Sequence, residues 1–188
     1  MRHVPYKLIL VSLVATLVLA IAAGGPQAAS RRPEPPAFGD FSDRVNQYLQ
    51  LRKALPKQHT TKRRKEIVDR RTALAQAIRE ARPDAKQGNI FSAETSAQFL
   101  AVIRRTLQGT KAANVRKTIR QGDPVAGVRV SVNRPYPEDL PTTTVPPTLL
   151  KRLPQLPERL AYRIVGHEFV LQDTEARLVI DFIPGALP

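Results

Sequence analysis

The C-terminal residues 161–183, AYRIVGHEFVLQDTEARLVIDFI, constrain the fold more than any other part of the chain. Gly166-His167 separates two runs rich in β-branched and aromatic residues, and a Gly-X pair suits a two-residue II′ turn. A second loop is expected at residues 173–176. The expected opposite pairs are Val165 with Glu168, Ile164 with Phe169, Tyr162 with Leu171, Leu171 with Leu178, and Phe169 with Ile180. The pattern predicts a three-strand antiparallel meander.

One face of this meander is apolar throughout. Its members are Tyr162, Ile164, Phe169, Leu171, Leu178, Ile180 and Phe182. A slip of one residue would move each set to the other face, so the agreement across three strands supports the register. The opposite face is expected to face solvent. It carries Arg163, Glu168, Val170, Gln172, Arg177, Val179 and Asp181.

In this register Glu168 and Asp181 lie directly opposite each other. Like charges in that position destabilise a sheet unless something compensates them. One interpretation is a carboxylate pair for acid–base or metal chemistry, which would make the chain a hydrolase. The other is two solvated side chains on an open sheet face. We favour the second interpretation and lean towards a protein without catalytic activity.

Other catalytic signatures are missing from the sequence. The chain has no cysteine, and its histidines are His3, His59 and His167. His167-Glu168 lacks the second histidine of a zincin motif, and neither a phosphate-binding loop nor a G-x-S-x-G elbow is found. We therefore expect no cofactor and no metal.

The N-terminus reads as an export signal. Arg2 and Lys7 precede an apolar run at residues 8–23, and small residues follow. This is the pattern of a cleaved signal peptide, here residues 1–29, and it predicts a periplasmic or secreted protein. The alternative is a membrane anchor formed by residues 8–23, although that run is shorter than the roughly 20 apolar residues of a span.

The remaining chain is expected to form one domain over residues 41–188, after a proline-rich leader at 30–40. Residues 41–122 predict about four helices. The first is capped by Asp40 and ends at Pro56, the second begins at Thr60 or Thr61 and ends at Pro83, the third is capped by Ser92, and the fourth covers 111–122. Residues 123–188 form the β segment, with one further strand at 128–133 and a crossover that holds seven prolines between 134 and 159. The fold class is therefore α+β, with the helices packed on a small antiparallel sheet.

Positive charge concentrates in the helical half. Residues 30–122 contain 21 Lys and Arg against 8 Asp and Glu, whereas residues 123–188 contain 7 against 8. The candidate binding residues are Lys62, Arg63, Arg64, Lys65, Arg70, Arg71, Arg104 and Arg105. They predict a patch for an anionic envelope component, whether acidic lipid, polysaccharide or protein. Nucleic acid is not expected, because aromatic interleaving is sparse. The alternative is a merely solvated helical face.

The block VPPTLLKRLPQLPERLAYRIVGHEFVLQDTEARLVIDFIPGALP resembles a set of exported bacterial proteins of unknown function. In that set a signal peptide and a helical segment precede a Pro-Pro-Thr-Leu-Leu stretch and a Tyr-Arg-x-Val-Gly hairpin. FSDRVNQYLQLRKALP and QGNIFSAE are similar to it as well. The resemblance implies export and supports the boundaries above, but it supplies no activity, cofactor, catalytic residue or oligomeric state. Our overall expectation is an exported cell-envelope protein with a binding or structural role.

Overall fold

The computed structural model describes residues 38–56, 63–108, 113, 129–136 and 143–187. The chain divides into two units, Met1–Arg32 and Pro33–Pro188, and every element below belongs to the second. The elements are α1 Gly39–Ala54, α2 Arg64–Ala81, α3 Ala93–Gln108, β1 Thr143–Thr144, α5 Pro147–Leu150, β2 Leu160–Val165, β3 Glu168–Asp173 and β4 Leu178–Ile183. The strands form one antiparallel sheet in the order β1-β2-β3-β4. The α+β prediction is confirmed, while the predicted fourth helix lies outside the described residues except for residue 113.

Local sequence signals set the ends of the helices. α1 ends at Ala54, two residues before Pro56. Ser92 caps α3, since its hydroxyl accepts a hydrogen bond from the Thr95 amide at 3.2 Å. The predicted cap of α1 is wrong: Phe38 holds the cap position, and Asp40 lies in the first turn. There the Asp40 carboxylate binds Arg44 and the Ser92 hydroxyl, which links α1 to the start of α3.

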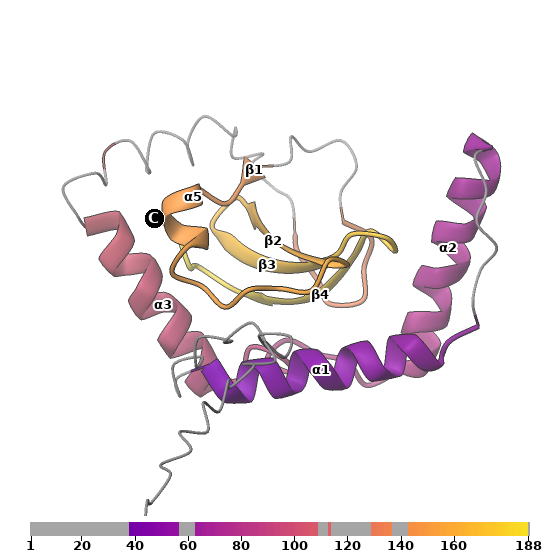
Figure 1. The fold of residues 1–188 in the computed structure, drawn as a ribbon, viewed down its shortest axis with the longest axis horizontal. Coiled ribbons are helices and arrows are strands. Elements are labelled where there is room, and N and C mark those ends of the chain that lie inside the picture. The colour runs from indigo at the N-terminus through magenta and orange to yellow at the C-terminus, as the bar shows by residue number, and fades with distance from the viewer. Residues whose placement is uncertain (1–37, 57–62, 109–112, 114–128, 137–142, 188) are drawn as a thin grey trace, which may run out of the picture. The chain divides into compact units, whose positions relative to one another are not determined.

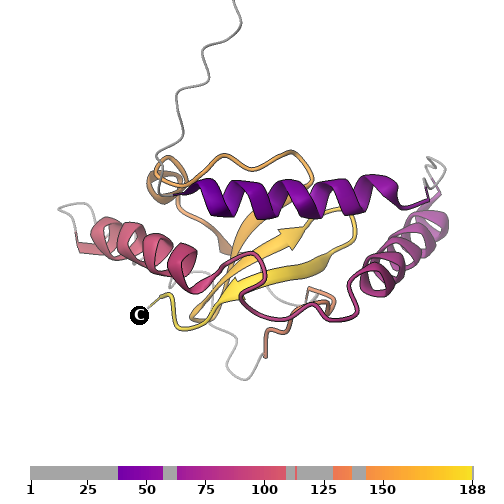
Figure 2. The same cartoon turned by 90° about the horizontal axis from the view of Figure 1, so that it is seen from below.

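An aromatic cluster joins the helices to the sheet. Phe41 of α1 lies 5.0 Å from Phe99 of α3, ring centre to ring centre. Phe99 in turn lies 5.9 Å from Phe169 of β3, which stacks on Tyr162 of β2 at 5.2 Å. Figures 1 and 2 show α1 running along the sheet, with α3 near one end of α1 and α2 near the other. The core is therefore a layer of helices packed against one sheet face.

The first hairpin has the predicted register. Ile164 pairs with Phe169 and Val165 with Glu168, so Gly166-His167 forms the two-residue turn. Gly166 has a φ of 57°, in the left-handed region that a glycine adopts without strain.

The register predicted between β3 and β4 is wrong. Asp173 pairs with Leu178, so the turn covers residues 174–177. The Asp173 carboxylate accepts the amides of Glu175 and Ala176 and holds this turn. A bulge follows, after which Leu171 pairs with Asp181 instead of with Leu178 as predicted. Glu168 and Asp181 are consequently not opposite each other, and the predicted pairing of these two carboxylates is wrong.

The bulge also changes which side chains face the helices. Ile180 belongs to the main core, and the neighbouring Asp181 also points to the helix side, where it meets the loop before α3. Beyond the bulge the alternation is reversed. Ile183 takes the core position that we predicted for Phe182, and Phe182 packs on the other face. A β-bulge re-aims side chains in this way because two residues oppose one on the partner strand.

The second face of the sheet is not the open, solvated face that we predicted. Val170 and Val179 are buried there, together with Val165 and Tyr136. The backbone around Tyr136 reaches β4: its amide donates to the Arg177 carbonyl at 2.7 Å, and the Val179 amide donates to Arg134 at 3.0 Å. The strand predicted at 128–133 is absent over the described residues 129–133. β1 provides the fourth strand instead.

Candidate functional site

The Asp181 carboxylate is fully buried and accepts hydrogen bonds from backbone amides. Its Oδ2 accepts the amides of Ile90 and Phe91 at 2.7 and 2.8 Å. Its Oδ1 accepts those of Gly88 and Phe182 at 3.0 and 2.9 Å. Four backbone amides thus donate hydrogen bonds to the charged group, and the charge of Arg82 also interacts with it. The carboxylate ties the loop between α2 and α3 to β4.

Glu168 lies at the start of β3 and is half-buried. Burial raises the pKa of its carboxyl group, while a hydrogen bond from the Gly185 backbone and the proximity of His167 act in the opposite direction. Its Oε2 is buried and has no hydrogen-bond partner. Glu168 and Asp181 do not pair across the strands, so these two carboxylates do not form a dyad. Among the described residues, no group of three His, Asp or Glu side chains is placed to hold a metal ion.

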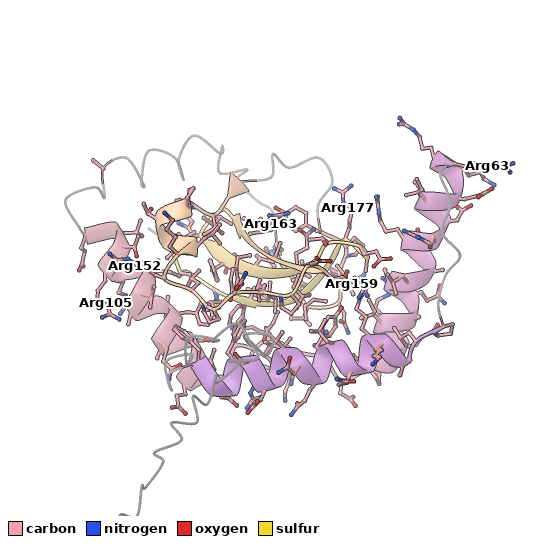
Figure 3. The ribbon with its side chains drawn as sticks, viewed as in Figure 1. Arg63, Arg105, Arg152, Arg159, Arg163 and Arg177 are labelled. Atoms are coloured by element: carbon pink, nitrogen blue, oxygen red, sulfur yellow. The ribbon has the colours of Figure 1, made fainter. Side chains whose placement is uncertain are left out.

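The predicted basic patch divides into two separate surfaces. Arg63, Arg64 and Lys65 begin α2, whereas Arg104 and Arg105 lie near the end of α3. Figure 3 shows Arg63 and Arg105 at opposite ends of the view, with the sheet between them. All five side chains are exposed. Lys62, which was also predicted for this patch, lies outside the described residues.

The first half of α2 contributes no buried side chain. The buried residues of this helix begin at Leu74 and continue with Ala75 and Ile78. Val68 is 48% exposed and lies beside the cations. We call residues 63–68 the basic end of α2. Arg71, in the next turn, is half-buried, and Arg70 turns towards a cleft described below.

A cleft lies between the C-terminal half of α1, α2 and the segment before β2. Its volume is about 570 Å³. Four cations line it, from three parts of the chain: Arg52 and Lys53 of α1, Arg70 of α2, and Arg159. Glu158 and Glu175 supply negative charge, and Leu49, Leu55, Pro56, Leu74 and Pro157 supply apolar surface. We call this feature the arginine cleft.

A buried ion pair holds Arg52 in place at the wall of the cleft. Its Nε donates to the Oδ2 of Asp173 at 2.6 Å, and Asp173 is fully buried. The Tyr48 hydroxyl donates to the same oxygen at 2.8 Å. Burial, followed by the Asp173 charge, raises the pKa of Tyr48 well above its ordinary value. A buried charge that loses its partner is costly, so this arrangement fixes the guanidinium of Arg52.

Glu175 lies among three guanidinium groups. Its Oε2 binds Nη2 of Arg52 at 2.6 Å and lies 3.4 Å from Nε of Arg159. Its Oε1 lies 3.7 Å from Nη2 of Arg70. The hydrogen bond from Arg52 lowers the pKa of Glu175; burial opposes this shift, and the charges of Arg70 and Arg159 add to it. The cleft is thus a site where a carboxylate is bound by converging arginines.

Sequence reasoning identified only Arg70 among the cleft cations. The sequence contained one pattern that could have identified Arg52. This residue follows Tyr48 by four positions, so it continues the apolar stripe of α1 with a cation. No such pattern identified Lys53 and Arg159, since their meeting depends on how α1 packs beside the segment that precedes β2. Glu175 was assigned only to a loop.

Comparisons with protein-family models, with curated proteins and with solved structures found no match to this chain. The resemblance to exported bacterial proteins stays a prediction.

Proposed function

We propose that the chain is an exported cell-envelope protein that binds an anionic lipid surface through the basic end of α2. The observation that carries the proposal is the exposure of Arg64 and Lys65, beside Arg63, which pairs with Glu66 at 3.2 Å, on a helical half that contains no fully buried side chain. A segment kept helical and charged without a packing role is available for a partner. The strong positive balance of residues 30–122 supports an anionic one.

The exposed Val68 favours lipid over a purely charged polymer. Basic residues beside an apolar side chain on one helix suit the boundary between head groups and acyl chains. Each basic residue near an anionic bilayer contributes about 1 kcal/mol, so a few of them together give measurable binding. Of the described residues, no helix combines the length and hydropathy required to cross a bilayer. An acidic polysaccharide or an acidic protein remains an outcome of the test.

A carboxylate-based hydrolase is not proposed. The Asp181 oxygens already accept four amide hydrogen bonds, and Glu168 is not its neighbour across the strands. Neither carboxylate belongs to the arginine cleft.

The test compares two matched charge reversals. Arg64→Glu with Lys65→Glu changes the basic end of α2, and Arg104→Glu with Arg105→Glu makes the same change of charge on α3. Binding is measured by co-sedimentation with vesicles that contain phosphatidylglycerol, against vesicles of phosphatidylcholine alone. Removing two basic contacts should weaken binding by at least about 30-fold. The α3 variant should bind nearly as well as the wild type.

Salt provides a second criterion. Screening acts over about 8 Å at physiological ionic strength, so binding should fall steeply as salt is raised. Equal losses in the two variants would show that only net charge matters and would contradict the assignment to α2. If the α2 variant binds vesicles as well as the wild type, the basic end of α2 is only a solvated face. Binding to acidic polysaccharide but not to vesicles would show that the partner is a polymer and not a lipid.

A further inference from the structure

We propose that the arginine cleft binds a small amphipathic anion, with one carboxylate or phosphate on a short apolar chain, and that Glu175 occupies the anion's position in the free protein. The inference goes beyond the lipid surface proposed above and does not depend on it.

The charge balance of the cleft favours an anion. Four cations line it against two carboxylates, Glu158 and Glu175. The charge of Arg52 is already neutralised by its ion pair with the buried Asp173. Arg70 and Arg159 meet Glu175 only at 3.7 and 3.4 Å, longer than the 2.7–2.9 Å of a strong charge-assisted hydrogen bond. A guanidinium carries five N–H donors in a planar fork, and each of these contacts engages a single nitrogen. Both arginines can therefore accommodate a better-placed anion.

Glu175 is suited to leave this position. Its side chain is 36% exposed, and it belongs to the four-residue turn between β3 and β4. Arg52 keeps its 2.6 Å bond to Asp173 when Glu175 moves away, so the buried ion pair stays intact. Displacement then costs one short ion pair with the largely buried Arg52 and two longer, partly exposed contacts with Arg70 and Arg159. An incoming carboxylate or phosphate restores those pairs with the same arginines.

The apolar lining determines what is attached to the anion. Leu49 and Leu55 of α1, Leu74 of α2 and Pro157 surround the charged groups. A volume of about 570 Å³ lies within the range of about 300–1,000 Å³ typical of small-molecule sites. A charged head with a short hydrocarbon chain matches this combination, whereas a fully polar anion leaves the apolar lining unused.

Octanoate and octyl phosphate are the probes, and octyl glucoside is the uncharged control with the same chain. Binding to the full protein is measured by titration calorimetry below the micellar concentration of each probe. The wild type should bind both anions and not the glucoside. Glu175→Gln removes the competing charge and should tighten binding by about two- to fivefold. Arg70→Gln with Arg159→Gln should weaken it about tenfold, with the ion pair between Arg52 and Asp173 retained.

The outcomes are separable from those of the vesicle test. Arg64→Glu with Lys65→Glu should leave octanoate binding unchanged, since neither residue lines the cleft. Equal affinity for octyl glucoside would show an apolar pocket without anion recognition and would overturn the inference. Unchanged affinity in the Arg70 and Arg159 double variant would do the same, as would weaker binding to a folded Glu175→Gln protein. A preference between octanoate and octyl phosphate identifies which head group the cleft selects.

Discussion

Replacing Asp181 with asparagine should destabilise the protein by about 2–6 kcal/mol. The two carboxylate oxygens each accept two amides: Oδ1 from Gly88 and Phe182, and Oδ2 from Ile90 and Phe91. Asparagine retains one oxygen, and its NH₂ group faces two N–H donors whichever way the amide is turned. Two amides thus lose their acceptor, and each buried unsatisfied group costs about 1–3 kcal/mol. The change is nearly isosteric, so no cavity contributes.

Asp84→Asn is the matched control. Asp84 belongs to the same loop between α2 and α3 but is exposed, and such surface changes stay within about 0.5 kcal/mol. Urea unfolding followed by circular dichroism measures the stability of both variants. Native-state amide exchange then locates the effect, because the Ile90 and Phe91 amides should lose protection before those of β2. A loss below about 1 kcal/mol for Asp181→Asn, or unchanged exchange at residues 88–91, would refute the reasoning.

Three further predictions concern the core, the cleft and the N-terminus. Phe169→Ala should cost about 3–5 kcal/mol in urea unfolding, because this fully buried ring meets Phe91, Phe99 and Tyr162; a loss below about 1 kcal/mol would contradict the packing. The stability that Glu175 contributes should be present above the pKa of an unfolded glutamate, about 4.3, and disappear as the pH falls through its lowered folded-state pKa. The difference in unfolding free energy between wild type and Glu175→Gln should therefore shrink towards zero in acid, and a constant difference would exclude this linkage. N-terminal sequencing of protein from its native host should find a start between Ala23 and Arg31 if the signal peptide is cleaved, whereas an intact Met1 would favour the anchor.

Several features set by short stretches of sequence were predicted correctly, although the cap of α1 was not. The register of β2 and β3 follows from Gly166-His167 and the alternation of apolar residues beside it. The end of α1 before Pro56 and the cap of α3 by Ser92 follow from backbone chemistry within a few residues. Turn geometry, proline and capping act locally, so the sequence by itself determined these features and the α+β class.

The tertiary structure decided the rest, because the deciding partners are distant in sequence. A charged Asp181 in the core is tolerable only when amides from residues 88–91, about ninety positions away, surround it. Alternation alone assigned that carboxylate to the open face. The arginine cleft depends in the same way on three segments, since Arg52, Arg70 and Arg159 meet Glu175 only after α1 and α2 pack beside the end of the sheet. Long-range packing, which periodicity does not encode, places the buried charges and the cleft they form.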